Sequence, residues 1–321
     1  YYSDGATGQG IDVAIIDTGV TPVAGLSIKG KIVNGPDLSF DSQSEKLRHL
    51  DANGHGTHLA GIIAGNDSGQ LAVSKTSFAL ADETDITQFR GIAPGARIVN
   101  VKAGNHHGAV DVSQVIAAID WVIEHRRDNG LDIRVLNLAY GTDGKQAYTS
   151  DPLAYAVQRA WKAGIVVVVA TGNDGNAAAV RNPAIDPYVI AVGASNTTTT
   201  TPFVTGFSNC GTRERHPDVV APGRSIISLR TPGSVVDEAN PQAVVAERFF
   251  LGSGTSQASA VVSGAAALML DQRPDLTPDQ VKAILMKTAD PVKGTSLCQG
   301  AGQINLAAAR KIGPPKATQG W

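Results

Sequence analysis

Four polar residues, each close to a glycine, stand in short motifs whose side-chain types could carry nucleophilic catalysis. They are Asp17 in VAIIDTG, His55 in NGHGTHLAG, Asn173 in ATGNDG and Ser256 in GSGTSQAS. A serine hydroxyl becomes a good nucleophile when a neighbouring base takes its proton, and histidine is the natural base near neutral pH. A carboxylate can fix the imidazole tautomer, and an amide can stabilise a developing oxyanion. Together, the four types suit the attack of a serine on a carbonyl group.

Each of the four residues also has an ordinary structural explanation. A serine at a helix start is usually an N-cap, and Ser256 stands just before the apolar run VVSGAAALML. A lone aspartate at the end of a strand usually caps a loop, and GNDG is also a turn sequence. None of the four is convincing by itself, so the interpretation depends on their joint pattern.

Short apolar runs alternate with segments of helical periodicity, which predicts an α/β fold with a parallel sheet. The runs are β-branched and nearly continuous, as strands covered on both faces should be. They cover residues 11–16, 97–101, 133–138, 165–170 and 188–192. Capping residues, or a proline at the first helical position, mark helix starts in DVSQ (111–114), DP (151–152) and TPDQ (277–280).

The four polar residues occupy comparable positions in this predicted fold, because sites in such sheets gather at the carboxyl ends of strands. Asp17 and Asn173 stand at strand ends, and His55 and Ser256 lie where glycine-rich turns run into helices. Residues 67–90 and 231–247 lack periodicity and are predicted to be long loops. No linker divides the chain, so we predict a single domain over residues 1–321.

The composition excludes some classes of function and leaves others open. The net charge of the 321 residues is −2, which gives no electrostatic footprint for nucleic acid. No apolar run approaches the roughly 20 residues of a membrane span. The start of the sequence does not resemble a signal peptide, so we expect either a cytosolic protein or a processed mature form. Cys210 and Cys298 could form a disulfide or remain two free thiols.

The joint pattern resembles a known family. AIIDTGV, NGHGTHLAG, ATGNDG and GTSQAS are similar to the four signature blocks of subtilisin-like serine peptidases, in the family's order of Asp, His and Ser. The resemblance runs from about Gly10 to about Ala309. It implies a three-layer α/β fold, with a mostly parallel central sheet flanked by helices. It also implies hydrolysis of peptide bonds through an acyl-enzyme.

The resemblance assigns a role to each motif. Asp17 would orient His55, which would act as the general base and then as the acid. Ser256 would attack the carbonyl, and Asn173 with the Ser256 backbone N–H would bind the oxyanion. Thr255 would support this oxyanion hole from behind.

The resemblance also places the substrate. LNLAYG (136–141) is similar to the strand that pairs with the substrate backbone, and such pairing favours broad specificity. Two short segments would flank the pocket for the residue before the cut: Ala139, Tyr140 and Gly141 on one side, and Ala170, Thr171 and Gly172 on the other. GNHHGA (104–109) falls where the family builds the other rim strand.

Charged and titratable residues near these segments have open interpretations. Arg181 aligns near the floor of the specificity pocket, where a cation would favour an acidic side chain before the cut. His106 and His107 would lie near subsites further up the substrate, or would be two solvated loop histidines. Asp82, Glu83 and Asp85 could bind a structural calcium ion, or could form a solvated acidic loop; we therefore assign no metal ligands.

Three residues depart from the family pattern beside the serine. Gln257 replaces the usual methionine and cannot form a sulfoxide. Ala260 stands where proline is common, and Ser253 replaces a frequent asparagine.

The resemblance also implies partners and location. It implies protein or peptide substrates, inhibition by the protein's own pro-segment before maturation, a monomer, and secretion.

Two other classes of protein fit the motifs less well. In a metallohydrolase, Asp51, His55 and His58 would bind a metal ion, but His-Glu-x-x-His is absent and GTSQAS would be unexplained. A catalytically silent binding protein on the same fold would usually lack a residue of the Asp–His–Ser triad, and none is missing here.

Overall fold

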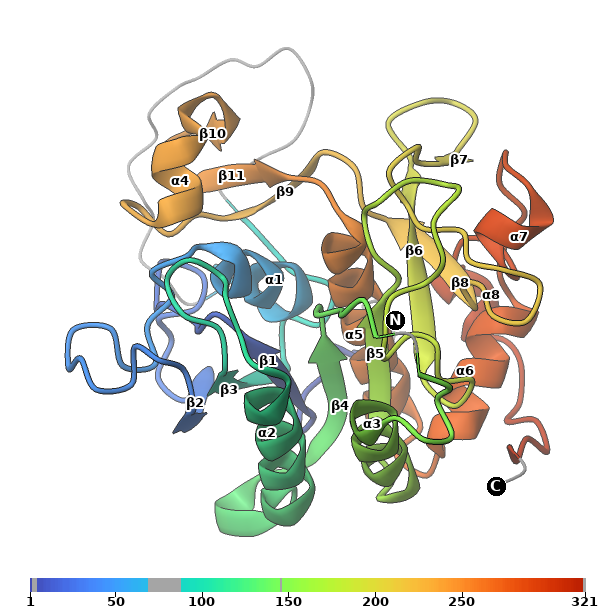
Figure 1. Cartoon of the computed structure of the whole chain (residues 1–321), viewed down its shortest axis with the longest axis horizontal. Coiled ribbons are helices and arrows are strands. Elements are labelled where there is room, and N and C mark those ends of the chain that lie inside the picture. Colours follow the sequence, from blue (N-terminus) through green and yellow to red (C-terminus); the bar gives the residue numbers. More distant parts are fainter. Residues whose placement is uncertain (2–4, 69–87, 145, 320–321) are drawn as a thin grey trace.

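A mostly parallel, eight-stranded sheet forms the centre of the protein (Figure 1). The computed structural model describes residues 1, 5–68, 88–144 and 146–319. The strand order is β2-β3-β1-β4-β5-β6-β7, and β8 pairs with β6 outside this path. β7 runs antiparallel to β6, whereas β1, β3, β4 and β5 pair in parallel. The strands are β1 (Asp12–Asp17), β2 (Ile32–Asp37), β3 (Arg97–Lys102), β4 (Ile133–Leu138), β5 (Val166–Ala170), β6 (Ile190–Asn196), β7 (Phe203–Val204) and β8 (Val219–Pro222).

The five apolar runs predicted as strands are confirmed as β1, β3, β4, β5 and β6. Their burial explains the pattern, since β5 is buried at every position and β1 at all but its last. β6 continues to Asn196, beyond the predicted end at residue 192. The edge strand β2 was not predicted because it is only half-buried and lacks a continuous apolar run.

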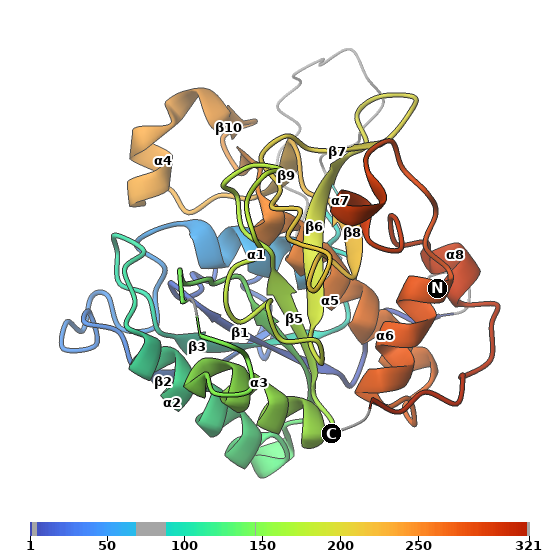
Figure 2. The same cartoon turned by 45° about the vertical axis from the view of Figure 1, so that its right-hand side comes forward.

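Helices cover both faces of the sheet, which confirms the layered α/β arrangement. α2 and α3 lie on one face, and α5 and α6 lie on the other (Figures 1 and 2). α1 packs against α5. The helices are α1 (His55–Ala64), α2 (Val112–His125), α3 (Pro152–Lys162), α4 (Val235–Ala239), α5 (Thr255–Gln272), α6 (Pro278–Lys287), α7 (Ser296–Gln299) and α8 (Leu306–Ala309), with short 3₁₀ turns η2 (Asp128–Gly130) and η3 (Pro241–Ala243).

The predicted helix starts are confirmed by their caps. The Asp111 side chain accepts from the Ser113 N–H, and the Gln114 side chain completes a capping box. Asp151 caps α3 ahead of its proline, and Thr277 caps α6 in a second capping box. None of the helices in the described part of the chain is long and apolar enough to cross a membrane.

The prediction of a long loop over residues 231–247 is wrong. This segment folds into α4, η3 and the short strand β10 (Val244–Val245), which joins β11 (Phe249–Gly252) and β9 (Ile226–Leu229) in a small antiparallel sheet. The Ser234 side chain caps α4. The other predicted loop, residues 67–90, lies largely outside the described residues.

A disulfide bond joins Cys210 to Cys298, which resolves the choice that the sequence left open. The bond connects the chain between β7 and β8 to α7, across a sequence separation of 88 residues. It closes a long loop of chain on the side of the sheet where β6 ends, and so restricts the unfolded state.

Candidate active site

Asp17 closes the central strand β1, at the carboxyl end of the parallel sheet. Its side chain is 5% exposed, and its Oδ1 accepts the Thr18 backbone N–H at 2.8 Å. A buried carboxylate needs such donors, because burial otherwise disfavours its charged form. The end of β1 therefore presents a fixed anion at the sheet edge where sites are expected.

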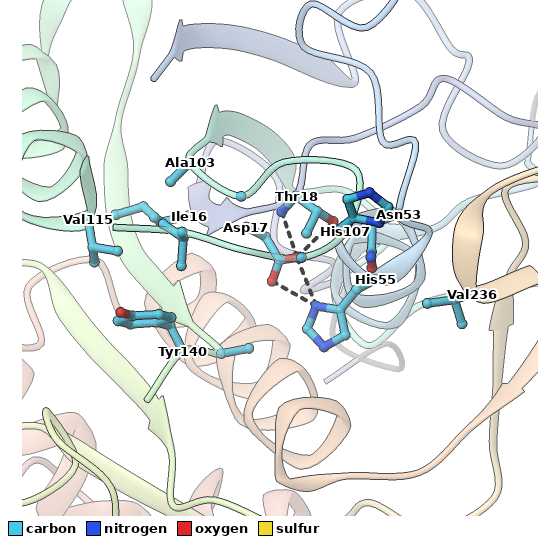
Figure 3. A pocket seen from close by; sticks show the side chains of 14 residues that line it. Ile16, Asp17, Thr18, Asn53, His55, Ala103, His107, Val115, Tyr140 and Val236 are labelled. Carbon is cyan, nitrogen blue, oxygen red and sulfur yellow. Dashed lines mark hydrogen bonds and ion pairs between the residues drawn. The ribbon is translucent and has the colours of Figure 1, made fainter. Parts of the chain in front are cut away.

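His55 is the first residue of α1, and its ring faces Asp17 (Figure 3). Nδ1 of His55 lies 2.8 Å from Oδ1 and 3.0 Å from Oδ2 of Asp17. Because an ionised carboxylate can only accept hydrogen bonds, Nδ1 carries the proton in this pair. Nε2 of the neutral ring is then the nitrogen left to accept a proton from a third group.

The surroundings of His55 raise its pKa above the usual value. Burial alone would lower this pKa, but the charge and hydrogen bond of Asp17 and the charge of Asp51 outweigh that effect. Asp17 thus stabilises the protonated ring as well as orienting it.

Asp51 joins the two elements that carry Asp17 and His55, a role that the sequence analysis missed. Its Oδ1 accepts the Gly54 N–H at 2.7 Å and lies 2.8 Å from Oγ1 of Thr18. Its Oδ2 accepts the Thr57 N–H at 2.7 Å in the first turn of α1. The available signal was an aspartate just before a helix start, which is typical of an N-terminal capping residue.

Ser256 is the second residue of α5 and is not its cap. The N-cap is Gly254, and no side-chain hydrogen bond caps this helix. The Ser256 carbonyl accepts from Ser259 Oγ at 2.8 Å, whereas none of the described residues hydrogen-bonds its hydroxyl. The ordinary explanation of Ser256 as a capping serine therefore fails.

Asn173 follows β5, and Thr255 fixes the orientation of its amide. Oδ1 of Asn173 accepts the Thr255 N–H at 2.8 Å and lies 3.1 Å from Thr255 Oγ1. The Gly172 N–H in turn donates to Thr255 Oγ1 at 3.2 Å. These contacts occupy Oδ1, and none of the residues that the structure describes accepts a hydrogen bond from Nδ2 of Asn173, which lies beside the start of α5.

The two segments expected to flank the pocket before the cut both lie close to Arg181. A Cβ added to Gly141 would come within 2.7 Å of Arg181 Cβ, and one added to Gly172 within 2.7 Å of Arg181 Cγ. β4 ends at Leu138 and β5 at Ala170, so both segments run out past the sheet.

The charge of Arg181 is already balanced. Its Nε and Nη2 donate to Asp174 at 2.7 Å and 2.6 Å, and its Nη1 pairs with Asp143. These three side chains line an open cavity of about 850 Å³. With two carboxylates against one guanidinium, the expected attraction for an acidic substrate side chain loses its physical basis.

The segment 104–109 forms a turn and not the expected rim strand. Asn105 closes it, because Oδ1 of Asn105 accepts the N–H groups of His107 and Ala109, both at 3.0 Å. The His106 side chain turns to the buried Asp41, with Nδ1 at 2.9 Å from Oδ1. The two histidines therefore differ, since His107 lines the cavity beside His55 and His106 anchors the turn.

The metal-binding alternative does not fit the donor atoms. The Nδ1 atom of His55 bonds Asp17, and the Nε2 atom of the buried His58 lies 3.1 Å from the Phe250 carbonyl. Burial lowers the pKa of His58 to about 4. Among the described residues, no group of three or more His, Cys, Asp or Glu side chains could hold a metal ion. Asp82, Glu83 and Asp85 lie outside these residues.

Comparison with known proteins identifies the family. The sequence model of the subtilase family matches residues 8–303. The chain belongs to the subtilase family. This subtilase is 36% identical to serine protease AprX of Bacillus subtilis, over 93% of the chain and 66% of the relative. It is 33% identical to subtilisin DY of Bacillus licheniformis, over 96% of this chain and 93% of that relative.

A solved structure supports the same fold for this subtilase. Fervidolysin from Fervidobacterium pennivorans, described as a keratinolytic enzyme related to subtilisin, matches with a TM-score of 0.75 and 28% identity. The match covers 98% of this chain and 44% of fervidolysin. The chain likewise spans about two thirds or less of several curated relatives, from 66% down to 35% of their length.

Proposed function

We propose that this subtilase is a serine endopeptidase that cuts peptide bonds through an acyl-enzyme. The single observation that carries the proposal is the pairing of His55 Nδ1 with Asp17 at 2.8 Å, which leaves Nε2 available. Family membership supports the same class of chemistry. Asp17, His55 and Ser256 act as the triad, and Asn173 belongs to the oxyanion hole.

The reaction proceeds in two steps, formation of the acyl-enzyme and its hydrolysis. Ser256 Oγ attacks the carbonyl carbon while His55 Nε2 takes its proton, and the carbonyl electrons move onto the oxygen. Nδ2 of Asn173 and the Ser256 N–H donate to this oxyanion. The imidazolium then gives its proton to the leaving amine as the C–N bond breaks. Water then attacks the ester of the acyl-enzyme in the same way, and the carboxylic acid product leaves as Ser256 regains its proton.

Substrate recognition follows from the segments around the site. Ala139–Gly141 would pair with the extended substrate backbone, which favours broad specificity. The side chain before the cut enters between this segment and residues 170–172, beside Arg181. Because Asp143 and Asp174 pair with Arg181, we expect no preference for glutamate there.

The remaining expectations concern the whole protein. We carry over one peptidase domain over residues 1–321, inhibition by a pro-segment, and a monomer from the family resemblance. Secretion is supported by one relative from Thermus that is named an extracellular serine proteinase. A structural calcium ion remains an expectation without assigned ligands or a part in the chemistry.

The test is to map the cleavage sites in a denatured protein mixture by mass spectrometry. We expect internal cuts at many sequences, without enrichment of glutamate before the cut. Ser256→Ala removes only the nucleophilic hydroxyl and should lower the rate by about 10⁶-fold. If Ser256→Ala cuts at the same bonds and rate, the proposal is wrong.

A further inference from the structure

The segment that carries α4 is docked directly on the chain leading to His55. The Val235 N–H donates to the Ala52 carbonyl at 3.0 Å, and the Val236 N–H donates to the Asn53 carbonyl at 3.0 Å. Gly54 lies so close that an added Cβ would come within 2.5 Å of Ser234 Oγ. α4 is therefore part of the wall of the active site, although residues 231–247 carry no recognisable motif.

Ion pairing fixes the shape of this segment. Arg230 donates to Asp237 through Nε at 2.5 Å and through Nη2 at 2.8 Å. The Gly233 N–H also donates to Asp237 at 2.9 Å. A bidentate pair of this kind adds geometric specificity as well as energy. Side chains on the first turn of α4 are thus held in place before a substrate arrives.

Val236 is the side chain of α4 that reaches the active site. It lines a cavity of about 320 Å³ together with Asp17, His55 and Tyr140. In Figure 3, Val236 lies on one side of His55 and Tyr140 on the other. Its neighbour Val235 is exposed and is not among the lining residues.

The geometry of an extended substrate decides which of its residues meets Val236. Side chains of an extended chain point alternately to opposite sides. If the side chain before the cut enters beside Arg181, the second residue before the cut faces the opposite cavity, and the fourth faces the same way. Since His55 acts at the cut, the second residue occupies the His55 end of the cavity, and the fourth occupies the Tyr140 end.

We propose that Val236 determines which side chain this subtilase accepts at the second residue before the cut. The inference rests on the proposed function. The methyl groups of Val236 close the His55 end of the cavity and set its depth, so the site favours a compact apolar side chain. An apolar wall of fixed position discriminates by size, at about tenfold or more for each added methylene group that does not fit.

The test compares size changes at Val236 with the same changes at Val235. Peptides that differ only at the second residue before the cut, as alanine, valine, leucine or phenylalanine, are cleaved by each variant. Val236→Phe should lower kcat/KM for leucine relative to alanine by about tenfold, and Val236→Ala should shift the preference toward phenylalanine. Val235→Phe carries the same bulk on the exposed side of α4 and should leave these ratios unchanged.

The outcomes separate this inference from the proposed function. If the unchanged protein cuts the peptides but the ratios do not move at Val236, the inference is wrong. It is also wrong if Val235→Phe changes the ratios as much as Val236→Phe does. If Ser256→Ala cuts as fast as the unchanged protein, the proposed function fails instead. Melting temperatures show whether a Val236 variant has lost its fold, and Val236→Ala then provides the smaller change.

Discussion

The two halves of the active site are organised differently. On one side, several hydrogen bonds from β1, α1 and Asp51 hold Asp17 and His55. On the other side, the start of α5 is buried and fixed, but none of the described residues hydrogen-bonds the Ser256 hydroxyl. The fixed groups orient a charge or a proton acceptor, and the Ser256 hydroxyl is the group that forms a new bond in the proposed mechanism.

This difference indicates which parts of the chemistry are ready before the substrate binds. The tautomer of His55 and the direction of the Asn173 amide are already set. The contact between the serine hydroxyl and the base often tightens only in the complex with substrate. Substitutions in the fixed half should therefore change the pH dependence, whereas those around the serine should change the rate alone.

Replacing Asp17, which orients His55, should lower activity more than replacing Asn173. In Asp17→Asn we expect kcat/KM to fall by about 10⁴-fold, because an amide no longer enforces the Nδ1–H tautomer. The negative charge of Asp17 raises the pKa of His55, so its loss should lower that pKa. The ascending limb of the pH profile, where His55 loses its proton, should then move to lower pH.

A profile of kcat/KM against pH measures both effects. Asp120→Asn is the matched control, because Asp120 is an exposed aspartate on α2 that pairs with Arg159. It should leave the limb and the rate unchanged. An unmoved limb in Asp17→Asn, despite the lower rate, would contradict the electrostatic part of the argument.

The oxyanion side should give a smaller loss and no shift with pH. Asn173→Ala removes the Nδ2 donor and should lower kcat by about 10²- to 10³-fold with little change in KM. Thr255→Val keeps the backbone N–H that donates to Asn173 Oδ1 but removes the hydroxyl that lies 3.1 Å from it. The fall in kcat should therefore be smaller than in Asn173→Ala. Steady-state kinetics measures kcat and KM separately. A rise in KM alone would assign Asn173 to substrate binding.

The sequence predicted the buried parallel strands and singled out the four motif residues, because both depend on local signals. Buried parallel strands are continuously apolar, and each motif carries its own glycines. Asp51 was seen only as a metal candidate, since its contacts with Thr18 and Thr57 depend on how β1 and α1 meet. No local sequence pattern predicts this tertiary contact.

The chain on either side of the substrate was harder to predict for the same reason. The segment 104–109 was expected as a strand, but Asn105 closes it into a turn and Asp41 anchors it. The α4 segment is short and mixed in polarity, so its sequence shows no helical periodicity of apolar residues. It is stabilised by Arg230 and Asp237, seven residues apart in the sequence, and by docking on residues 52–54.

Gln257 gives the smallest expected effect, because it follows Ser256 on α5 and, among the described residues, no hydrogen bond joins it to Asp17 or His55. It is buried, and a Cβ added to Gly254 would come within 2.7 Å of its Oε1. Gln257→Met should change the initial rate little, because the two side chains are similar in length. In peroxide, oxidation of that methionine would add a polar oxygen beside the chain leading to Ser256.

Few other sulfur-containing side chains in this chain could be oxidised and so inactivate the protein in peroxide. Its two cysteines form a disulfide, Met269 is fully buried, and Met286 lies on α6, away from the site. We therefore expect Gln257→Met to lose activity in peroxide several times faster than the unchanged protein, by the sulfoxide route that glutamine lacks. Residual peptide hydrolysis sampled over time gives both rates. Equal rates would mean that oxidation elsewhere inactivates this subtilase, and that position 257 does not control the nucleophile's surroundings.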